Sequence, residues 1–193
     1  PEDNVNSIGK TIQDMYKISC AGGGVGFNVS KIRPKGDTIG SVKNSAPGAV
    51  SVLKMINEVG EHVRAGKNRR TALMGILNIT HPDLMEFLSV KLDQGQLTNF
   101  NISVAITDRF LEAVELGEDW YFTFNNKEYH MYNLVRNDDD VIQVIAQDEE
   151  DAISRAENFH KEHFEDTFVV VGQQDIKARE LWDIIWKNSV ESG

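Results

Sequence analysis

Along residues 1–116 the apolar positions alternate between helical spacing and short uninterrupted runs. Apolar residues three to four positions apart predict helices, and continuous apolar runs predict buried strands of the kind found in parallel sheets. The expected helices cover residues 4–19, 50–64, 84–92 and 109–116, and the expected strands cover residues 22–30, 71–79 and 101–107. Repeated strand–helix units predict an α/β fold whose parallel strands are joined by right-handed crossovers.

Two short polar segments mark where helices begin. Thr80-His81-Pro82-Asp83 predicts a helix start with proline in the first turn, where its missing N–H costs nothing. Thr107-Asp108 predicts a second start, because threonine is a favoured N-cap residue and an acid suits the first turn.

Residues 118–175 follow a different pattern. Residues 120–124 and 128–135 predict two strands that form a hairpin around Asn125-Asn126. Further strands are expected at residues 141–146 and 168–172, a polar helix at 148–164 and a last helix at 177–190. We interpret residues 118–175 as an α+β insertion that elaborates the sheet of one domain, residues 1–193.

Composition excludes several classes of protein. The 193 residues carry a net charge of −10, which argues against a general nucleic-acid surface but leaves room for a nucleotide pocket. The single cysteine, Cys20, excludes an internal disulfide framework and indicates a reducing compartment. No apolar run approaches the length of a membrane span, so a cytoplasmic chain is expected. The first residues, PEDNV, resemble an internal cut because no methionine precedes them.

The glycine-rich stretch at residues 18–48 is the first candidate for chemistry. It contains Gly22, Gly23, Gly24 and Gly26, and glycine lets a ligand approach the backbone closely. A turn or bulge is the alternative interpretation. A dinucleotide fingerprint is excluded, because its glycines lie between a strand and the next helix, whereas these follow a helix.

Two other candidates for chemistry are weak. His160 and His163 are spaced for a shared metal ion, but they lie in a polar acidic helix without a third ligand nearby. Cys20 has no histidine or aspartate beside it in sequence, so a small structural residue is expected rather than a nucleophile.

Two basic loops remain as the main candidate for binding. Residues 33–48 contain Arg33 and Lys35, and residues 64–70 contain four basic residues in seven. If the helix between them returns the chain to one side of the sheet, both loops flank one ligand. Phosphate is the natural partner, because arginine binds it through two parallel hydrogen bonds. An exposed helix C-terminus rich in basic residues is the alternative.

Several ordered blocks resemble the large catalytic subunit of ribonucleotide reductase. They are GGGVGFNVSKIRPKGD, RAGKNRRTALMGIL, HPDLMEFL and NFNISVAITDRFLEAV. The glycine-rich strand and NFNISVAITD are most similar to the adenosylcobalamin-dependent class. The resemblance covers residues 2–116 and resumes at KARELWDIIWKNSVESG, whereas residues 118–175 match no motif of the family.

The resemblance implies a fold, an activity and a set of site residues. It implies part of a ten-stranded α/β barrel that reduces ribonucleotides by a thiyl-radical mechanism, with a deoxynucleoside triphosphate (dNTP) effector and Mg²⁺ at a homodimer interface. The implied effector-binding residues are Asp3, Asn4, Cys20, Arg33, Ile39, Arg64, Lys67 and Arg69, and the implied substrate-binding residues are Gly23, Gly24 and Arg70. Adenosylcobalamin is the implied cofactor, bound mostly outside this chain.

The sequence also departs from the family pattern. Ala65 replaces a usual glutamine, Lys67-Asn68 a glycine–lysine pair and Thr71 a glycine, and Cys20 stands where some members have a lysine. The family's radical cysteine is expected beyond residue 193 and one reducing cysteine upstream of residue 1, so no catalytic residue is expected here and the isolated polypeptide should not turn over. Two alternatives stay open: a nucleotide-binding regulatory module without catalysis, and a scaffold with solvated loops.

Overall fold

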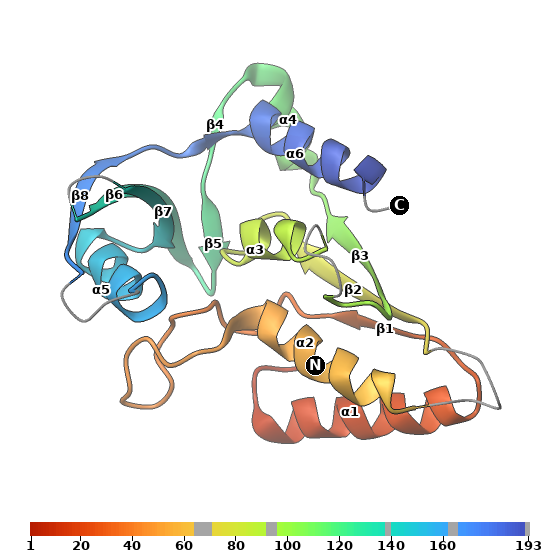
Figure 1. Ribbon diagram of the computed structural model, residues 1–193. Coiled ribbons are helices and arrows are strands. Elements are labelled where there is room, and N and C mark those ends of the chain that lie inside the picture. Colours follow the sequence, from red (N-terminus) through yellow and green to blue (C-terminus); the bar gives the residue numbers. More distant parts are fainter. Residues whose placement is uncertain (64–70, 92–95, 138–139, 162–165, 192–193) are drawn as a thin grey trace.

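A computed structural model describes residues 1–63, 71–91, 96–137, 140–161 and 166–191. Its first part alternates helices and strands, as the apolar pattern predicts (Figure 1). The elements are α1 (Val5–Cys20), β1 (Val25–Asn28), α2 (Gly48–Glu61), β2 (Leu73–Asn78), α3 (Leu84–Ser89), β3 (Phe100–Ala105) and α4 (Asp108–Leu116).

A three-stranded parallel sheet in the order β1-β2-β3 forms the centre of this part. Val25 is paired with Leu73, and Leu73 with Phe100, so the three strands run side by side in register. In Figure 1, α1 and α2 lie side by side on one side of the sheet and α4 and α6 on the other. The predicted α/β class is confirmed.

The core forms where α2 packs on β2. Leu53 is fully buried, and a Cβ added at Gly75 of β2 would lie 3.1 Å from its Cδ1 atom. The absence of a side chain at Gly75 therefore lets the helix approach the sheet closely. Phe87, Phe100 and Phe110 complete the buried layer around the sheet.

The glycine cluster ends a helix rather than opening a strand. Gly22 has φ +84°, its N–H donates to the carbonyl of Ser19 at 2.9 Å, and the N–H of Gly23 donates to the carbonyl of Ile18 at 3.0 Å. These two bonds define a Schellman motif at the C-terminus of α1. The predicted strand at 22–30 is therefore wrong at its start: β1 begins at Val25, because the preceding glycines complete the helix cap.

Two helices also differ from prediction at their boundaries. Helix α2 begins at Gly48 and ends at Glu61, two to three residues before the predicted limits. Pro82 precedes α3 instead of lying in its first turn, and Asp83 is the N-cap residue without a side-chain cap bond to that helix. The predicted cap at Thr107 is confirmed, since its side chain accepts from the N–H of Phe110.

A second, antiparallel sheet follows α4. It consists of β5 (Phe122–Phe124), β6 (Lys127–Arg136), β7 (Asp140–Ala146) and β8 (Phe168–Gln173), with β7 and β8 on opposite sides of β6. Asn125 and Asn126 both have positive φ, 49° and 63°, as a tight hairpin turn requires. Helix α5 (Glu149–Phe159) covers one face of this sheet. The predicted hairpin is confirmed. The polar helix predicted at 148–164 forms but ends at Phe159, with His160 as its C-cap residue.

The strands that precede and follow the second sheet pair with each other. Strand β4 (Asp119–Trp120) pairs antiparallel with β9 (Ile176–Lys177), and α6 (Ala178–Glu191) follows directly. Helix α6 packs beside α4 near the sheet (Figure 1). The interpretation of residues 118–175 as an insertion stays a prediction.

Within the described ranges, no helix combines the length and apolar character that crossing a membrane requires.

Candidate functional site

Asp3 and Arg33, two residues implied to bind effector, lie together at the start of α1. The Nε atom of Arg33 donates to Oδ2 of Asp3 at 2.6 Å, and its NH1 group donates to the carbonyl of Thr38 at 2.8 Å. Both side chains of the pair are about 30% exposed, 30% for Arg33 and 27% for Asp3. The pair thus joins the start of α1 to the loop that follows β1, at a place solvent reaches.

Asn4 and Cys20 mark the two ends of α1. The side chain of Asn4 accepts from the N–H of Ser7 at 2.8 Å and caps the helix. Cys20 is exposed and is the last residue of the same helix. A helix of this length extends about 24 Å at 1.5 Å per residue, so within one chain Cys20 lies far from Asp3 and Asn4. The structure does not bring these three implied contacts together.

The loop at residues 33–48 holds its own shape through backbone hydrogen bonds. Gly36 donates to the carbonyl of Ala46 at 2.9 Å, and Ala46 donates to that of Asp37 at 3.0 Å. Ile39 and Val42 exchange two bonds of 3.0 Å across the tip. Ile39, an implied effector contact, is 44% exposed there. An apolar side chain is thus presented outward at the tip of a closed loop.

Two cavities lie at the carboxyl ends of β1 and β2. One, of about 620 Å³, runs along α1 and β1, and the other, of about 500 Å³, lies beside Asp3 and Thr80. Both are lined by Ser30, Lys31 and Asn78. The carboxyl ends of parallel strands are the usual place for ligands in α/β proteins, so this is the natural substrate-sized space in the described residues.

The glycines implied to bind substrate line neither of these cavities. A Cβ at Gly23 would lie 2.6 Å from Cγ2 of Ile18, and one at Gly24 would lie 3.2 Å from the carbonyl oxygen of Ala72. Both positions therefore need glycine for packing in this structure. Gly26, by contrast, lines the larger cavity.

The second basic loop, residues 64–70, lies outside the described residues. This applies to Arg64, Lys67, Arg69 and Arg70, and also to His163 of the rejected metal pair. Thr71, directly after that loop, is described: its hydroxyl donates to the carbonyl of Gly60 at 3.0 Å. Within the described part of the chain, no group of three metal-ligating side chains occurs.

Asp83 is a residue that the sequence reasoning missed. Its carboxylate accepts from the N–H of Lys35 at 2.9 Å and from that of Ala49 at 2.7 Å, so it fixes both ends of the loop. Burial raises the pKa of Asp83, and the hydrogen bonds from the two backbone donors oppose that rise. In the sequence, His81-Pro82-Asp83 indicates a helix start. Nothing in this segment predicts that the Asp83 side chain bonds to the loop at residues 33–48.

His81 secures the same region. Its Nε2 atom lies 2.8 Å from the carbonyl of Ile32, and its Nδ1 atom accepts from the N–H of Asp83 at 3.0 Å. A ring that donates through Nε2 and accepts through Nδ1 uses both nitrogens in one tautomer. The segment before α3 therefore holds the loop where it leaves the sheet.

The fold and these loops correspond to a known class of protein domain. A family model described as "Ribonucleotide reductase, barrel domain" matches residues 1–193. The chain therefore belongs to the ribonucleotide reductase barrel-domain family, which confirms the resemblance inferred from the ordered sequence blocks.

Individual relatives agree with this family. The chain is 42% identical over 114 residues to a vitamin B12-dependent ribonucleoside-diphosphate reductase of Thermoplasma acidophilum, which covers 58% of this chain and 15% of that protein. It is 39% identical over 115 residues to the protein of the same name from Mycobacterium tuberculosis, covering 59% of this chain and 17% of the relative. The matched stretch thus spans less than a fifth of either relative.

One solved structure shows the same fold. The alpha subunit of a class Id ribonucleotide reductase from Actinobacillus ureae superposes with a TM-score of 0.51. The match covers 61% of this chain and 21% of that subunit, at 22% sequence identity. This likeness supports the α/β architecture.

Proposed function

We propose that this chain is the part of a ribonucleotide reductase that binds the dNTP effector and faces the ribonucleotide substrate. The observation that supports this most is the Asp3–Arg33 pair, 2.6 Å between Nε and Oδ2, which joins α1 to the loop at residues 33–48. A carboxylate accepts from sugar hydroxyls, and a guanidinium binds phosphate. The pair thus supplies the two chemistries that a nucleotide needs.

The remaining implied contacts complete the proposed effector site. Ile39 at the exposed loop tip would cover the base or sugar, and Asn4 lies next to Asp3 at the helix start. The further contacts stay proposals at Cys20, Arg64, Lys67 and Arg69. Mg²⁺ would be held chiefly by the effector phosphates, as is usual for this ion.

We propose a ribonucleotide as the substrate. Two relatives are named ribonucleoside-diphosphate reductases. Gly23, Gly24 and Arg70 remain the proposed substrate contacts.

The described residues do not fit adenosylcobalamin. The larger of the two cavities at the strand ends is about 620 Å³ and has a mixed polar and apolar lining. It is too small to hold a corrin ring with its adenosyl and nucleotide arms. We therefore assign no step to this cofactor here, in keeping with its expected place mostly outside this chain. The proposal of cobalamin dependence rests on the names of the relatives.

We also propose that the protein is a homodimer that pairs through α1. Val5 and Tyr16, which are eleven positions and so about three turns apart on one face of this helix, are 86% and 49% exposed. Large apolar side chains exposed on one helix face are typical of an interface. Such a contact would place the effector loops of two chains beside the same helices.

Calorimetric titration of dNTPs with Mg²⁺ tests the effector site. Arg33→Met and Asp3→Asn should each weaken binding about tenfold or more, because each removes a charged contact to the ligand. Lys10→Met is the matched control, since Lys10 forms an exposed ion pair with Asp14 on the same helix. Absence of dNTP binding by the folded dimer would refute the proposal.

A regulatory module without catalysis is the second candidate. The one cysteine, Cys20, is exposed at the end of α1, and thiyl chemistry with a dithiol reductant needs more thiols than one. Both candidates predict that the 193-residue chain alone does not reduce ribonucleotides. Turnover by that chain would therefore contradict both, since each assigns catalysis to other parts of the protein.

A further inference from the structure

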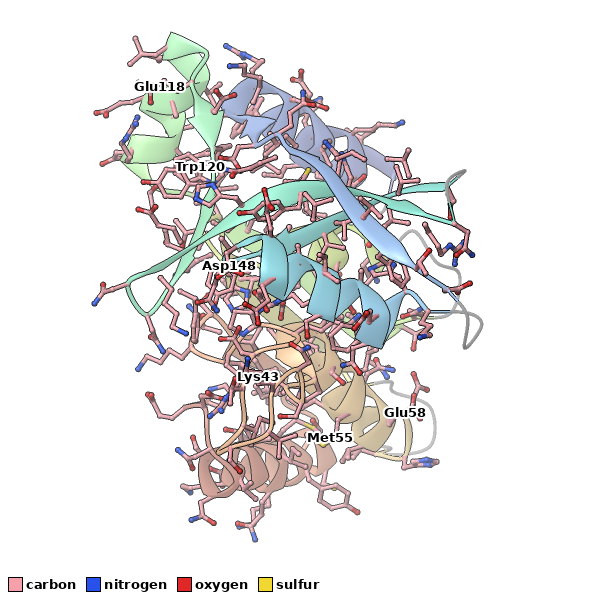
Figure 2. All side chains as sticks on the ribbon, turned by 90° about the vertical axis from the view of Figure 1, so that its left-hand side faces the viewer. Lys43, Met55, Glu58, Glu118, Trp120 and Asp148 are labelled. Atoms are coloured by element: carbon pink, nitrogen blue, oxygen red, sulfur yellow. The ribbon has the colours of Figure 1, made fainter. Side chains whose placement is uncertain are left out.

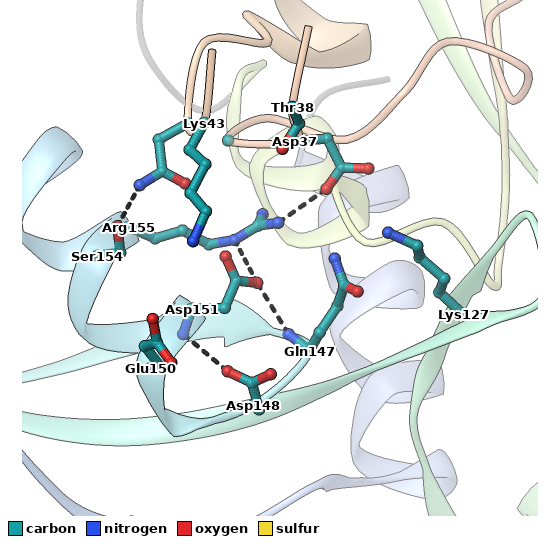
Figure 3. A pocket seen from close by; sticks show the side chains of 12 residues that line it. Asp37, Thr38, Lys43, Lys127, Gln147, Asp148, Glu150, Asp151, Ser154 and Arg155 are labelled. Carbon is teal, nitrogen blue, oxygen red and sulfur yellow. Dashed lines mark hydrogen bonds and ion pairs between the residues drawn. The ribbon is translucent and has the colours of Figure 1, made fainter. Parts of the chain in front are cut away.

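The second sheet and α5 lie directly against the loop at residues 33–48. Figure 2 shows Lys43 of this loop below Asp148, which begins α5. The close view in Figure 3 places Arg155 of α5 between the loop and the acidic start of its own helix. Two segments that are more than 100 positions apart therefore share one polar contact region.

Arg155 makes the central contact. Its side chain is 6% exposed, NH2 donates to Oδ1 of Asp37 at 2.8 Å, and NH1 donates to the carbonyl of Lys35. Its Nε donates to Oδ2 of Asp151 at 2.9 Å, which holds the side chain in place from within α5. A buried charge with each donor group satisfied fixes geometry, because removing one partner leaves the other buried and unpaired.

Tyr129 strengthens the hold on Asp37 from the second sheet. Its hydroxyl lies 3.0 Å from both carboxylate oxygens of Asp37, and its ring lies 5.5 Å from the Arg155 guanidinium. Gly36 has φ +85°, and a Cβ there would lie 3.1–3.2 Å from Arg155. The absence of a side chain at Gly36 therefore lets the Arg155 side chain approach the loop backbone closely.

The opposite limb of the loop is bonded to the same helix. The side chain of Asn44 donates to the hydroxyl of Ser154, and the carbonyl of Asn44 accepts from the side chain of Asn158 at 2.8 Å. Both limbs of the loop, at residues 36–37 and at 44, are therefore bonded to α5. This contact sets the position of the loop relative to the second sheet.

The Arg155–Asp37 contact is linked to the Asp3–Arg33 pair through the peptide that joins Asp37 to Thr38. Asp37 is held by Arg155, and the next residue, Thr38, offers its carbonyl to Arg33 at 2.8 Å. Arg33 in turn binds Asp3 at the start of α1. A shift of the loop at Asp37 thus displaces one of the two groups that orient the Arg33 guanidinium.

We infer that Arg155 is a positioning residue: together with Tyr129 it fixes the loop at residues 33–48 and so sets the affinity of the Arg33 site for nucleotide. The second half of this statement rests on the proposed dNTP site, whereas the first half concerns the loop alone. Residues 122–173 thereby become part of the regulatory machinery of this protein.

Hydrogen–deuterium exchange on the intact protein tests the first half without any ligand. Arg155→Met should raise exchange at the bonded loop amides of Gly36, Asp37 and Ala46 by about tenfold. Arg136→Met is the matched control, because Arg136 lies in the same sheet but bonds Asp140 and the carbonyl of His160 instead of the loop. Loop exchange that is equal in wild type and Arg155→Met would overturn the inference.

Calorimetry with dATP, dTTP and dGTP tests the second half. Arg155→Met should weaken dNTP binding about tenfold, Arg155→Lys should restore part of it and Arg136→Met should leave it unchanged. Faster loop exchange with unchanged dNTP affinity would overturn the positioning role. If wild type binds no dNTP, the proposed effector site fails, and the exchange result still decides whether Arg155 fixes the loop.

A merely structural role predicts a different outcome. If Arg155 only stabilises the second sheet, Arg136→Met should weaken dNTP binding and accelerate loop exchange as much as Arg155→Met does. Equal effects of the two variants would therefore contradict the inference. Tyr129→Phe, which removes one hydroxyl from Asp37 and keeps the ring, should give the same loop-limited effect in smaller measure.

Discussion

The carboxylate of Asp83 lies 2.7 Å from the backbone nitrogen of Ala49, in the first turn of α2. Asp83 is the N-cap residue of α3, yet its side chain satisfies an otherwise unpaired donor of a different helix. One side chain therefore ties the start of α3 to the end of the loop at residues 33–48.

Asp83→Asn should destabilise the fold. The amide keeps one acceptor, but its NH₂ group then faces a backbone N–H, and a buried donor left without an acceptor costs about 1–3 kcal/mol. The free energy of unfolding, measured in urea, should fall by about that amount. Asp14→Asn, at an exposed ion pair on α1, serves as the control and should change little. Equal stability of wild type and Asp83→Asn would contradict the capping role.

Alanine substitutions at Gly48 and Gly40 form a matched pair that tests how tightly the space around Asp83 is packed. Both have positive φ, +83° and +61°, but a Cβ at Gly48 would lie 2.6 Å from Oδ2 of Asp83, whereas Gly40 has open space. Both alanine variants bear backbone strain, and Gly48→Ala adds overpacking of about 1–3 kcal/mol. Thermal unfolding should therefore show a clearly lower Tm for Gly48→Ala than for Gly40→Ala. Similar Tm values would show that the loop end is not tightly packed.

The raised pKa of Tyr129 predicts that the free energy of unfolding decreases at high pH. Burial and the neighbouring Asp37 carboxylate raise the pKa of Tyr129 above its ordinary value of 10.0. A group with a raised folded pKa contributes stability that is fully present below its unfolded pKa, about 10, and is lost as pH rises above it. Urea unfolding at pH 8 to 11 should show this decline in wild type and a flatter profile in Tyr129→Phe.

Tyr121→Phe is the control for that titration, because Tyr121 is 42% exposed and lies outside the Asp37 contact. Its profile should follow wild type. If Tyr129→Phe loses stability with pH as steeply as wild type, the hydroxyl of Tyr129 is not the group responsible.

Substitution in the Asp3–Arg33 pair should affect dNTP binding more than the stability of the fold. Because the pair is partly exposed, Asp3→Asn should lower the free energy of unfolding by less than about 1 kcal/mol. The dNTP dissociation constant should nevertheless rise about tenfold, which corresponds to about 1.4 kcal/mol of binding. A large loss of stability with unchanged affinity would assign the pair to the fold instead of the effector.

The alternation of helices and strands was predictable because its signals are local. The cap at Thr107 and the Asn125-Asn126 hairpin depend on neighbours within three or four positions, and the structure confirms both. The glycines at 22–24 were harder, because the same residues suit a strand start and a helix cap. Only the bonds from Gly22 and Gly23 back to α1 decide between them.

The long-range contacts had no signal in the sequence. Arg155 and Asp37 are 118 positions apart, and Asp83 and Ala49 are 34 positions apart. Each of these residues has an ordinary local explanation: a polar helix, a loop or a helix start. The family resemblance indicated the importance of Arg33 and Asp3 but gave nothing for residues 118–175, where it stops.

The pairing of β4 with β9 has a consequence for the segment between them. Because Trp120 and Ile176 are direct partners across two antiparallel strands, the chain leaves the domain and returns to it at neighbouring points, about 5 Å apart. A segment of any length can be inserted or removed between such points without disturbing α4 and α6. If residues 118–175 are an insertion, as predicted from the sequence, the β4–β9 pairing is the point where it joins the domain.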